Sequence, residues 1–245
     1  MTAIALLTRR TLVRGRVDLV FAVLMPTFVL AGLVLLLQDV IATGQMSYTQ
    51  YVLPAVVVQA MLFGALTTTD RAAWDTISGL STRMRTLPIS PYAMLTARMV
   101  YCLIRGVLAV IASVMAAYSF GFRFTTGFGY GAAFVLMALT LTLALSLGAD
   151  VTGTKAGRTE VASQLLLVPQ LLLVLLSTGL APLDAFPSWL QGFVHYQPVS
   201  QITEAMRGFT SGHVDAGNLG VSLAWCVGLL VVFGTIAVRL QGRTP

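Results

Sequence analysis

Residues 177–209 read STGLAPLDAFPSWLQGFVHYQPVSQITEAMRGF and separate two long apolar runs. Pro187 and Pro198 each stand where a short helix can begin, because the N–H group that Pro lacks has no partner at the first helical position. The second helix carries one apolar stripe at spacings of four and three, formed by Ile202, Met206 and Phe209. At about 1.5 Å per residue, neither helix can cross a hydrocarbon core of about 30 Å. We therefore predict a re-entrant or interfacial helical hairpin over residues 181–212.

The composition of the whole chain is that of an integral membrane protein. Hydrophobic residues make up 57% of it, charged residues 10%, and the mean hydropathy is +0.85, whereas a soluble domain carries about 25% charged residues. The net charge of +6 does not indicate a nucleic-acid partner, because the basic residues lie at the ends of apolar runs, where they act as topology signals. Cys102 and Cys226 fall inside apolar runs without metal-ligand or disulfide spacing, so we expect no metal site.

Six apolar runs predict an all-α protein with six transmembrane helices in one domain, residues 1–245. The predicted spans are 19–38, 52–70, 99–119, 130–149, 161–180 and 219–239. The first run follows four arginines but is too long for the apolar part of a signal peptide, so we expect an uncleaved helix. Residues 3–13 are expected to form an additional helix at the inner membrane surface.

The basic residues also predict the orientation of these spans. With the N-terminus inside, every Lys and Arg except Arg123 and Arg207 falls on the inner side. An excess of Lys and Arg marks cytoplasmic loops. We therefore expect both termini in the cytoplasm of a bacterial cell, the chain in its inner membrane, and the hairpin on the outer side.

The stretch 177–209 resembles the hairpin before the last membrane helix of ABC-2 type permeases, and is most similar to the daunorubicin-resistance (DrrB/DrrC-like) branch. GFRF at Gly121–Phe124 is a weaker second similarity. The matching positions are Ser177, Gly179, Pro182, Leu183, Pro187, Trp189, Gln191, Phe193, Gln197, Pro198, Ser200, Met206, Arg207 and Gly208.

This resemblance implies a function and a set of partners. It implies the permease subunit of an ATP-driven exporter that moves a hydrophobic drug-like compound or a lipid out of the cell. ATP and Mg would then bind to a separate cytoplasmic ABC ATPase subunit, and a second copy of the chain or a sister permease would complete the pathway. The alternative is a membrane scaffold or assembly protein without a transport path of its own.

The longest inner loop, Asp70–Tyr92, resembles the region of ABC-2 permeases that docks into the ATPase. Trp74, Ile77 and Leu80 recur at a spacing of three and predict a short helix across the membrane base. The candidate coupling residues are Trp74, Asp75, Ile77, Leu80, Arg83 and Arg85. The alternative is an ordinary positive loop with a Trp at the membrane interface.

The second inner loop, Gly148–Glu160, contains a pattern that only approaches a nucleotide-binding motif. Gly148 and Gly153 have the separation of the glycines in a P-loop, but Thr154 stands where that motif needs Lys. We therefore expect no cofactor in this chain, and a minor docking contact at this loop.

Polar and charged residues inside the spans are few. We expect the Arg105 side chain to reach the membrane interface, as long basic side chains do, rather than to serve transport. No Asp or Glu lies in the interior of a predicted span, which argues against proton coupling and against an enzyme. Candidates for lining a pathway are Gln59, Thr140, Gln164 and Gln170, with hydrogen bonding between helices as the alternative.

The outer hairpin is expected to act as a gate at the outer leaflet, or else as a structural lid over the bundle. The helix after Pro187 is expected to place Trp189, Leu190, Phe193 and Val194 on one side. Glu204 and Arg207, three residues apart, are expected to pair. The candidate gate residues are Pro187, Trp189, Phe193, Pro198, Met206 and Arg207.

Overall fold

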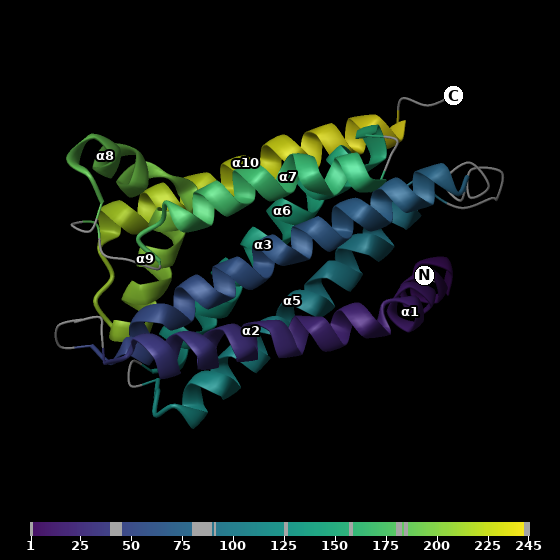
Figure 1. The fold of residues 1–245 in the computed structure, drawn as a ribbon. Helices are drawn as coiled ribbons and strands as arrows, with labels where there is room; N and C mark the ends of the chain where they lie inside the picture. The colour runs from purple at the N-terminus through teal and green to yellow at the C-terminus, as the bar shows by residue number, and fades with distance from the viewer. Residues whose placement is uncertain are drawn as a thin grey trace.

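The computed structural model describes residues 2–39, 46–79, 90, 92–124, 127–156, 159–179, 183 and 186–242. Within these ranges the chain is helical and contains no strand, which confirms the predicted all-α class (Figure 1). The helices are α1 Thr2–Arg14, α2 Arg16–Leu37, α3 Tyr48–Ile77, α5 Ala93–Ser119, α6 Phe128–Ala156, α7 Thr159–Leu175, α8 Ser188–Tyr196, α9 Pro198–Ser211 and α10 Ala216–Gly242.

Five of these helices are long and apolar enough to cross a membrane: α2, α3, α5, α6 and α10. They correspond to the predicted spans one to four and six. The predicted fifth span corresponds to α7, whose 17 residues give a length of about 26 Å, slightly short of a hydrocarbon core. In Figure 1, α7 runs in line with the long helices, and it packs against α3 and α6. A sixth span therefore stays a prediction.

The bundle is built around α3. This helix packs against α2, α5, α6, α7 and α9, and apolar residues on all of its sides are buried, including Val52, Val56 and Val58. A helix that is apolar all round belongs in a core. In contrast, α2 and α10 leave most of their apolar side chains exposed, as helices do when one face meets lipid.

Two predicted inner loops are shorter than expected, because helices extend into them. α3 continues past Asp70 to Ile77, and α6 continues past Gly148 to Ala156. The segment 70–77 contains no Gly or Pro that would end a helix; Gly79, with a φ of 68°, is the first residue that does. The predicted separate helix through Trp74 and Ile77 is therefore wrong: both residues belong to the last turns of α3. Leu80, Arg83 and Arg85 lie outside the described residues.

The two short helices of the 177–209 stretch are confirmed. Pro187 is the residue before α8 and Pro198 is the first residue of α9, as their sequence positions predicted. The apolar stripe of α9 is buried among α3, α6 and α10, with Met206 fully inaccessible. On α8 the four residues predicted to share a side lie along one broad side of the helix, with Val194 buried and with Trp189 and Phe193 exposed. A re-entrant position for the pair stays a prediction.

The backbones of α3 and α6 approach each other closely at Gly153. A Cβ atom at this position would overlap the carbonyl oxygen of Thr69 and lie 2.9 Å from Cβ of Ala72. Small residues at helix–helix contacts allow such approach, which favours packing in membranes.

Replacing Gly153 by Ala should push α3 and α6 apart and lower the free energy of unfolding by about 1–3 kcal/mol. Gly32→Ala is the matched control, because a Cβ at Gly32 meets nothing within 4 Å. The measurement is the thermal unfolding midpoint of each variant in the same detergent. Equal midpoints for the two variants would contradict a tight α3–α6 contact.

Candidate functional site

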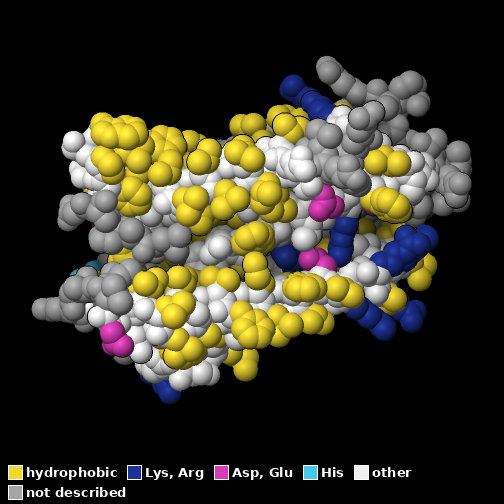
Figure 2. Space-filling model, viewed as in Figure 1, with side chains coloured by type: hydrophobic (Ala, Val, Ile, Leu, Met, Phe, Trp, Pro, Cys, Tyr) yellow, Lys and Arg dark blue, Asp and Glu magenta, His cyan; other side chains and the backbone are white. Residues whose placement is uncertain are grey.

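Basic side chains gather at the end of the bundle that carries α1, which we call the basic end. Figure 2 shows the dark-blue Lys and Arg side chains at this end, with Asp and Glu side chains among them. Four helix ends meet here: the first turns of α2 and α5 and the last turns of α3 and α6. Polar contacts between them form two groups.

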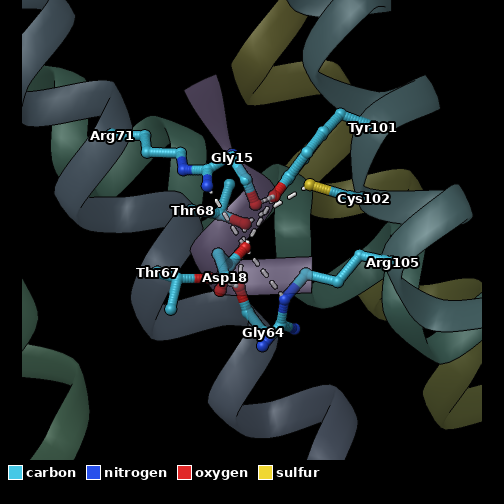
Figure 3. A network of polar contacts seen from close by, with 9 residues as sticks. All are labelled: Gly15, Asp18, Gly64, Thr67, Thr68, Arg71, Tyr101, Cys102 and Arg105. Atoms are coloured by element: carbon cyan, nitrogen blue, oxygen red, sulfur yellow. Dashed lines mark hydrogen bonds and ion pairs between the residues drawn. The ribbon is translucent and has the colours of Figure 1, made fainter. Parts of the chain in front are cut away.

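The first group centres on Asp18, in the first turn of α2 (Figure 3). Its Oδ2 atom accepts a hydrogen bond from the Tyr101 hydroxyl at 2.8 Å. The same atom lies 3.3 Å from Nη2 of Arg71 and 3.1 Å from Nε of Arg105. The Arg105 N–H is not aligned for a hydrogen bond, so that contact is ionic only. We call these four residues the Asp18 cluster; they join α2, α3 and α5.

Two glycines make room for the Asp18 cluster. A Cβ atom at Gly64 would overlap Nη1 of Arg105, so the guanidinium lies directly against the backbone of α3. A Cβ atom at Gly15 would lie 2.8 Å from Nη2 of Arg71 and would overlap the Tyr101 hydroxyl. The Arg71 guanidinium also lies over the Tyr101 ring, 4.3 Å from its centroid, in a cation–π contact.

The second group centres on Arg98 of α5. Its Nη2 atom donates to Asp75 of α3 at 2.8 Å, and its Nη1 atom donates to Asp150 of α6. The Asp150 side chain is 1% exposed, so its charge depends on this partner. We call these three residues the Arg98 bridge; it joins α5 to α3 and α6.

These contacts bear on several expectations from the sequence. The Arg105 side chain is buried and paired with Asp18 at the start of α2, a partner that the sequence did not indicate. Asp75, a candidate coupling residue, pairs with Arg98 within the chain, and its coupling role stays a prediction. Asp18, just before the first predicted span, was not among the candidate site residues, although a single acid at the end of an arginine-rich segment was a signal that it has a role.

Two cavities adjoin the basic end. One of about 610 Å³ lies among α1, the end of α3 and the start of α5, and Trp74 lines it. The other, of about 590 Å³, lies among α2, α3 and α5 beside the Asp18 cluster. Arg14 and Arg71 line both. Within the described ranges, no group of His, Cys, Asp or Glu is placed to hold a metal ion.

At the opposite end of the bundle, Arg207 of α9 holds two other segments. Its guanidinium lies over the Tyr51 ring at 3.7 Å, its Nε donates to the Tyr51 carbonyl oxygen, and its Nη2 donates to the Thr178 carbonyl oxygen. Burial lowers the pKa of Arg207, while the Tyr51 and Glu204 side chains act in the opposite direction. The expected Glu204–Arg207 pair is absent from the salt bridges of the described chain; Glu204 instead accepts a hydrogen bond from Asn218.

The four candidate pathway residues do not lie in one place. Gln59 lines a small cavity between α2 and α3. Thr140 donates to the carbonyl oxygen of Leu136 in its own helix. Gln164 is exposed and Gln170 is partly exposed on α7. None of these positions assigns a pathway, and the lining stays a prediction.

Comparison with known proteins gives one consistent result. Residues 2–209 match the ABC-2 type transporter family. The doxorubicin resistance ABC transporter permease protein DrrB of Mycobacterium tuberculosis is 32% identical over 202 residues, which cover 80% of this chain and 70% of that protein. The daunorubicin resistance ABC transporter permease protein DrrB1 of Streptomyces coeruleorubidus is 29% identical over 224 residues, covering 91% and 79%. The probable doxorubicin resistance ABC transporter permease protein DrrC of Mycobacterium tuberculosis is 28% identical over 154 residues, covering 63% and 55%.

Replacing Asp18 by Asn should leave the buried Arg105 guanidinium without a counter-charge and cost about 3–5 kcal/mol of stability. The measurement is the unfolding midpoint in detergent, with Asp39→Asn as control, since Asp39 is exposed. The double variant Asp18→Asn, Arg105→Gln should recover part of the loss, because it removes the unpaired charge as well. A destabilisation by Asp18→Asn no greater than that by Asp39→Asn would contradict the structural role of the cluster.

Proposed function

This chain belongs to the ABC-2 type transporter family and is the membrane permease subunit of an ABC exporter, and we propose that it moves a hydrophobic drug-like compound or a lipid out of the cell. ATP is hydrolysed on a separate ABC ATPase subunit. The names of the relatives, which refer to doxorubicin and daunorubicin resistance, support the drug-like class of substrate.

The proposed mechanism rests on the C-terminal end of α3, where two large apolar side chains are exposed. Trp74 is 64% exposed and Ile77 is 53% exposed there, although both are large apolar side chains. Exposed apolar side chains beside charged groups are typical of a docking surface. We assign this tip of α3, Trp74 and Ile77, to contact with the ATPase subunit.

The polar contacts next to the tip provide a way to transmit movement. The Arg98 bridge holds Asp75, one residue from Trp74, to α5 and α6. The Asp18 cluster holds Arg71, one turn earlier, to α2 and α5. A force on the tip therefore acts on three neighbouring helices through ion pairs, which can exchange between discrete arrangements during a transport cycle.

The orientation and the assembly follow from the same proposal. The basic end lies at the cytoplasmic face of the inner membrane, because Lys and Arg are retained on that side. The α8–α9 end then faces outward, where the exposed Trp189 and Phe193 lie at headgroup depth and Arg207 holds the gate closed. A second copy or a sister permease completes the pathway, and ATP and Mg stay on the ATPase.

Removing the tip by Trp74→Ala, Ile77→Ala should reduce co-purification of the partner ABC ATPase by about tenfold, since buried aromatic anchors dominate interfaces. ATP-dependent substrate uptake into inverted vesicles should fall with it. The matched control is Trp189→Ala, Phe193→Ala, which removes two exposed apolar side chains at the other end and should leave co-purification unchanged.

Two results would overturn this assignment. Equal loss of ATPase with both double variants would show that the tip is not the docking site. If the unaltered chain, folded in mild detergent, bound no ATPase at all, the scaffold alternative would replace the permease mechanism.

A further inference from the structure

The Asp18 cluster contains more positive than negative charge. Three guanidinium groups line the adjoining cavity of about 590 Å³, and Asp18 is the one acidic residue in that lining; the three are Arg14, Arg71 and Arg105. Arg71 and Arg105 share a single carboxylate oxygen, which also accepts from Tyr101. A charge as buried as Arg105 needs full compensation. The cavity therefore favours an additional anion from outside the chain.

Arg14 is the side chain best placed to receive this anion. It is exposed, lies at the end of α1, and forms no ion pair with any other part of the chain that the structure describes. It lines the cavity together with Arg71 and Arg105, so the anion would meet guanidinium groups from α1, α3 and α5. Guanidinium groups suit phosphate oxygens, because planar pairs of N–H donors match their spacing.

Beyond the arginines, the same cavity becomes an apolar groove between α2 and α3. Its walls are, on α2, Val17, Phe21, Ala22, Met25 and Pro26, and, on α3, Ala60, Phe63 and Leu66. A small cavity of about 10 Å³ shares four of these residues and lies beyond the groove, next to Val29 and Val56. From Val17 to Pro26 the groove is about 14 Å long at the rise of a helix.

The groove is open along the surface of the helix bundle, at the rim formed by α2. Val17 is 69% exposed and Phe21 is 60% exposed along the α2 rim. Figure 2 shows charged side chains in a hollow between apolar flanks at this end, and Figure 3 shows the arrangement of the Asp18 cluster, which lines the groove. A molecule moving within a membrane can therefore enter from the side, with its charged group at the basic end.

We propose that this groove binds a phospholipid with an anionic headgroup. Its phosphate contacts Arg14, Arg71 and Arg105, and an acyl chain lies between α2 and α3. The inference deepens the proposed function and rests on it for the membrane position of the basic end. The three arginines favour an anionic headgroup over a zwitterionic one. A zwitterionic headgroup would place its own positive charge next to the arginines, which repel it, whereas an anionic headgroup has no such charge.

The test is native mass spectrometry of the full chain, co-purified with its ATPase, delipidated in mild detergent and titrated with phosphatidylglycerol. Phosphatidylcholine with the same acyl chains is the lipid control. We expect one phosphatidylglycerol to be retained at least about fivefold more than phosphatidylcholine. Arg14→Gln should reduce its retention by about fivefold, as loss of a charge-assisted contact does. Arg16→Gln is the matched control, since Arg16 is also exposed but lines neither cavity.

A second pair of variants tests the apolar wall. Phe21→Ala should reduce phosphatidylglycerol retention by at least about threefold, because it removes a large contact with the acyl chain. Phe28→Ala should not, since Phe28 is 69% exposed on the same helix but lies outside the groove. Both residues are mostly exposed, so both variants are expected to fold.

Several outcomes would overturn the proposal. Equal retention of the two lipids, or equal effects of Arg14→Gln and Arg16→Gln, would show that the groove does not select an anionic lipid. Displacement of phosphatidylglycerol by inorganic phosphate at equal concentration would assign the arginines to a free anion. If Arg14→Gln released the ATPase and the unaltered chain retained no lipid, the three arginines would be assigned to contact with an acidic segment of the ATPase. ATPase retention without any bound lipid would reject this inference alone and leave the permease function standing.

Discussion

The carboxylate of Asp18 is the contact on which the basic end of this protein depends. One oxygen atom lies within 3.3 Å of a hydroxyl and two guanidinium groups that come from two other helices. In a bundle whose helices are mainly apolar, charged contacts of this kind limit how far one helix can slide or rotate against the next. The cluster also depends on Gly15 and Gly64, because a side chain at either position would occupy the space of Tyr101, Arg71 or Arg105.

The Asp18 cluster and the Arg98 bridge both connect the end of the central helix α3 to neighbouring helices. Its buried middle packs on five helices, while its end carries two exposed apolar residues next to both polar groups. In the proposed mechanism, this end of α3 contacts the ATPase and passes its movement to the rest of the bundle. The excess of arginine around the same carboxylate also explains why the neighbouring groove suits an anionic amphiphile.

The opposite end is organised differently, by packing rather than by ion pairs. α9 is part of the core, with Ile202 and Met206 almost inaccessible, whereas α8 contributes only Val194 and leaves its aromatic side chains exposed. Arg207 connects α9 to α3 and to the turn after α7 through one ring and two carbonyl groups. An outer gate made of α8 and α9 would therefore move against α3 at Arg207.

The sequence by itself determined the helical class, the spans α2, α3, α5, α6 and α10, and the short helices after Pro187 and Pro198. Hydropathy and the geometry of Pro are local properties, so they can be read without knowing the neighbours. Only the tertiary structure decided that Asp18 pairs with Arg71 and Tyr101, which are 53 and 83 positions away. A helix that is apolar on all sides has no face that its sequence directs toward a particular neighbour. The charges at its ends therefore find their partners only when the helices pack together.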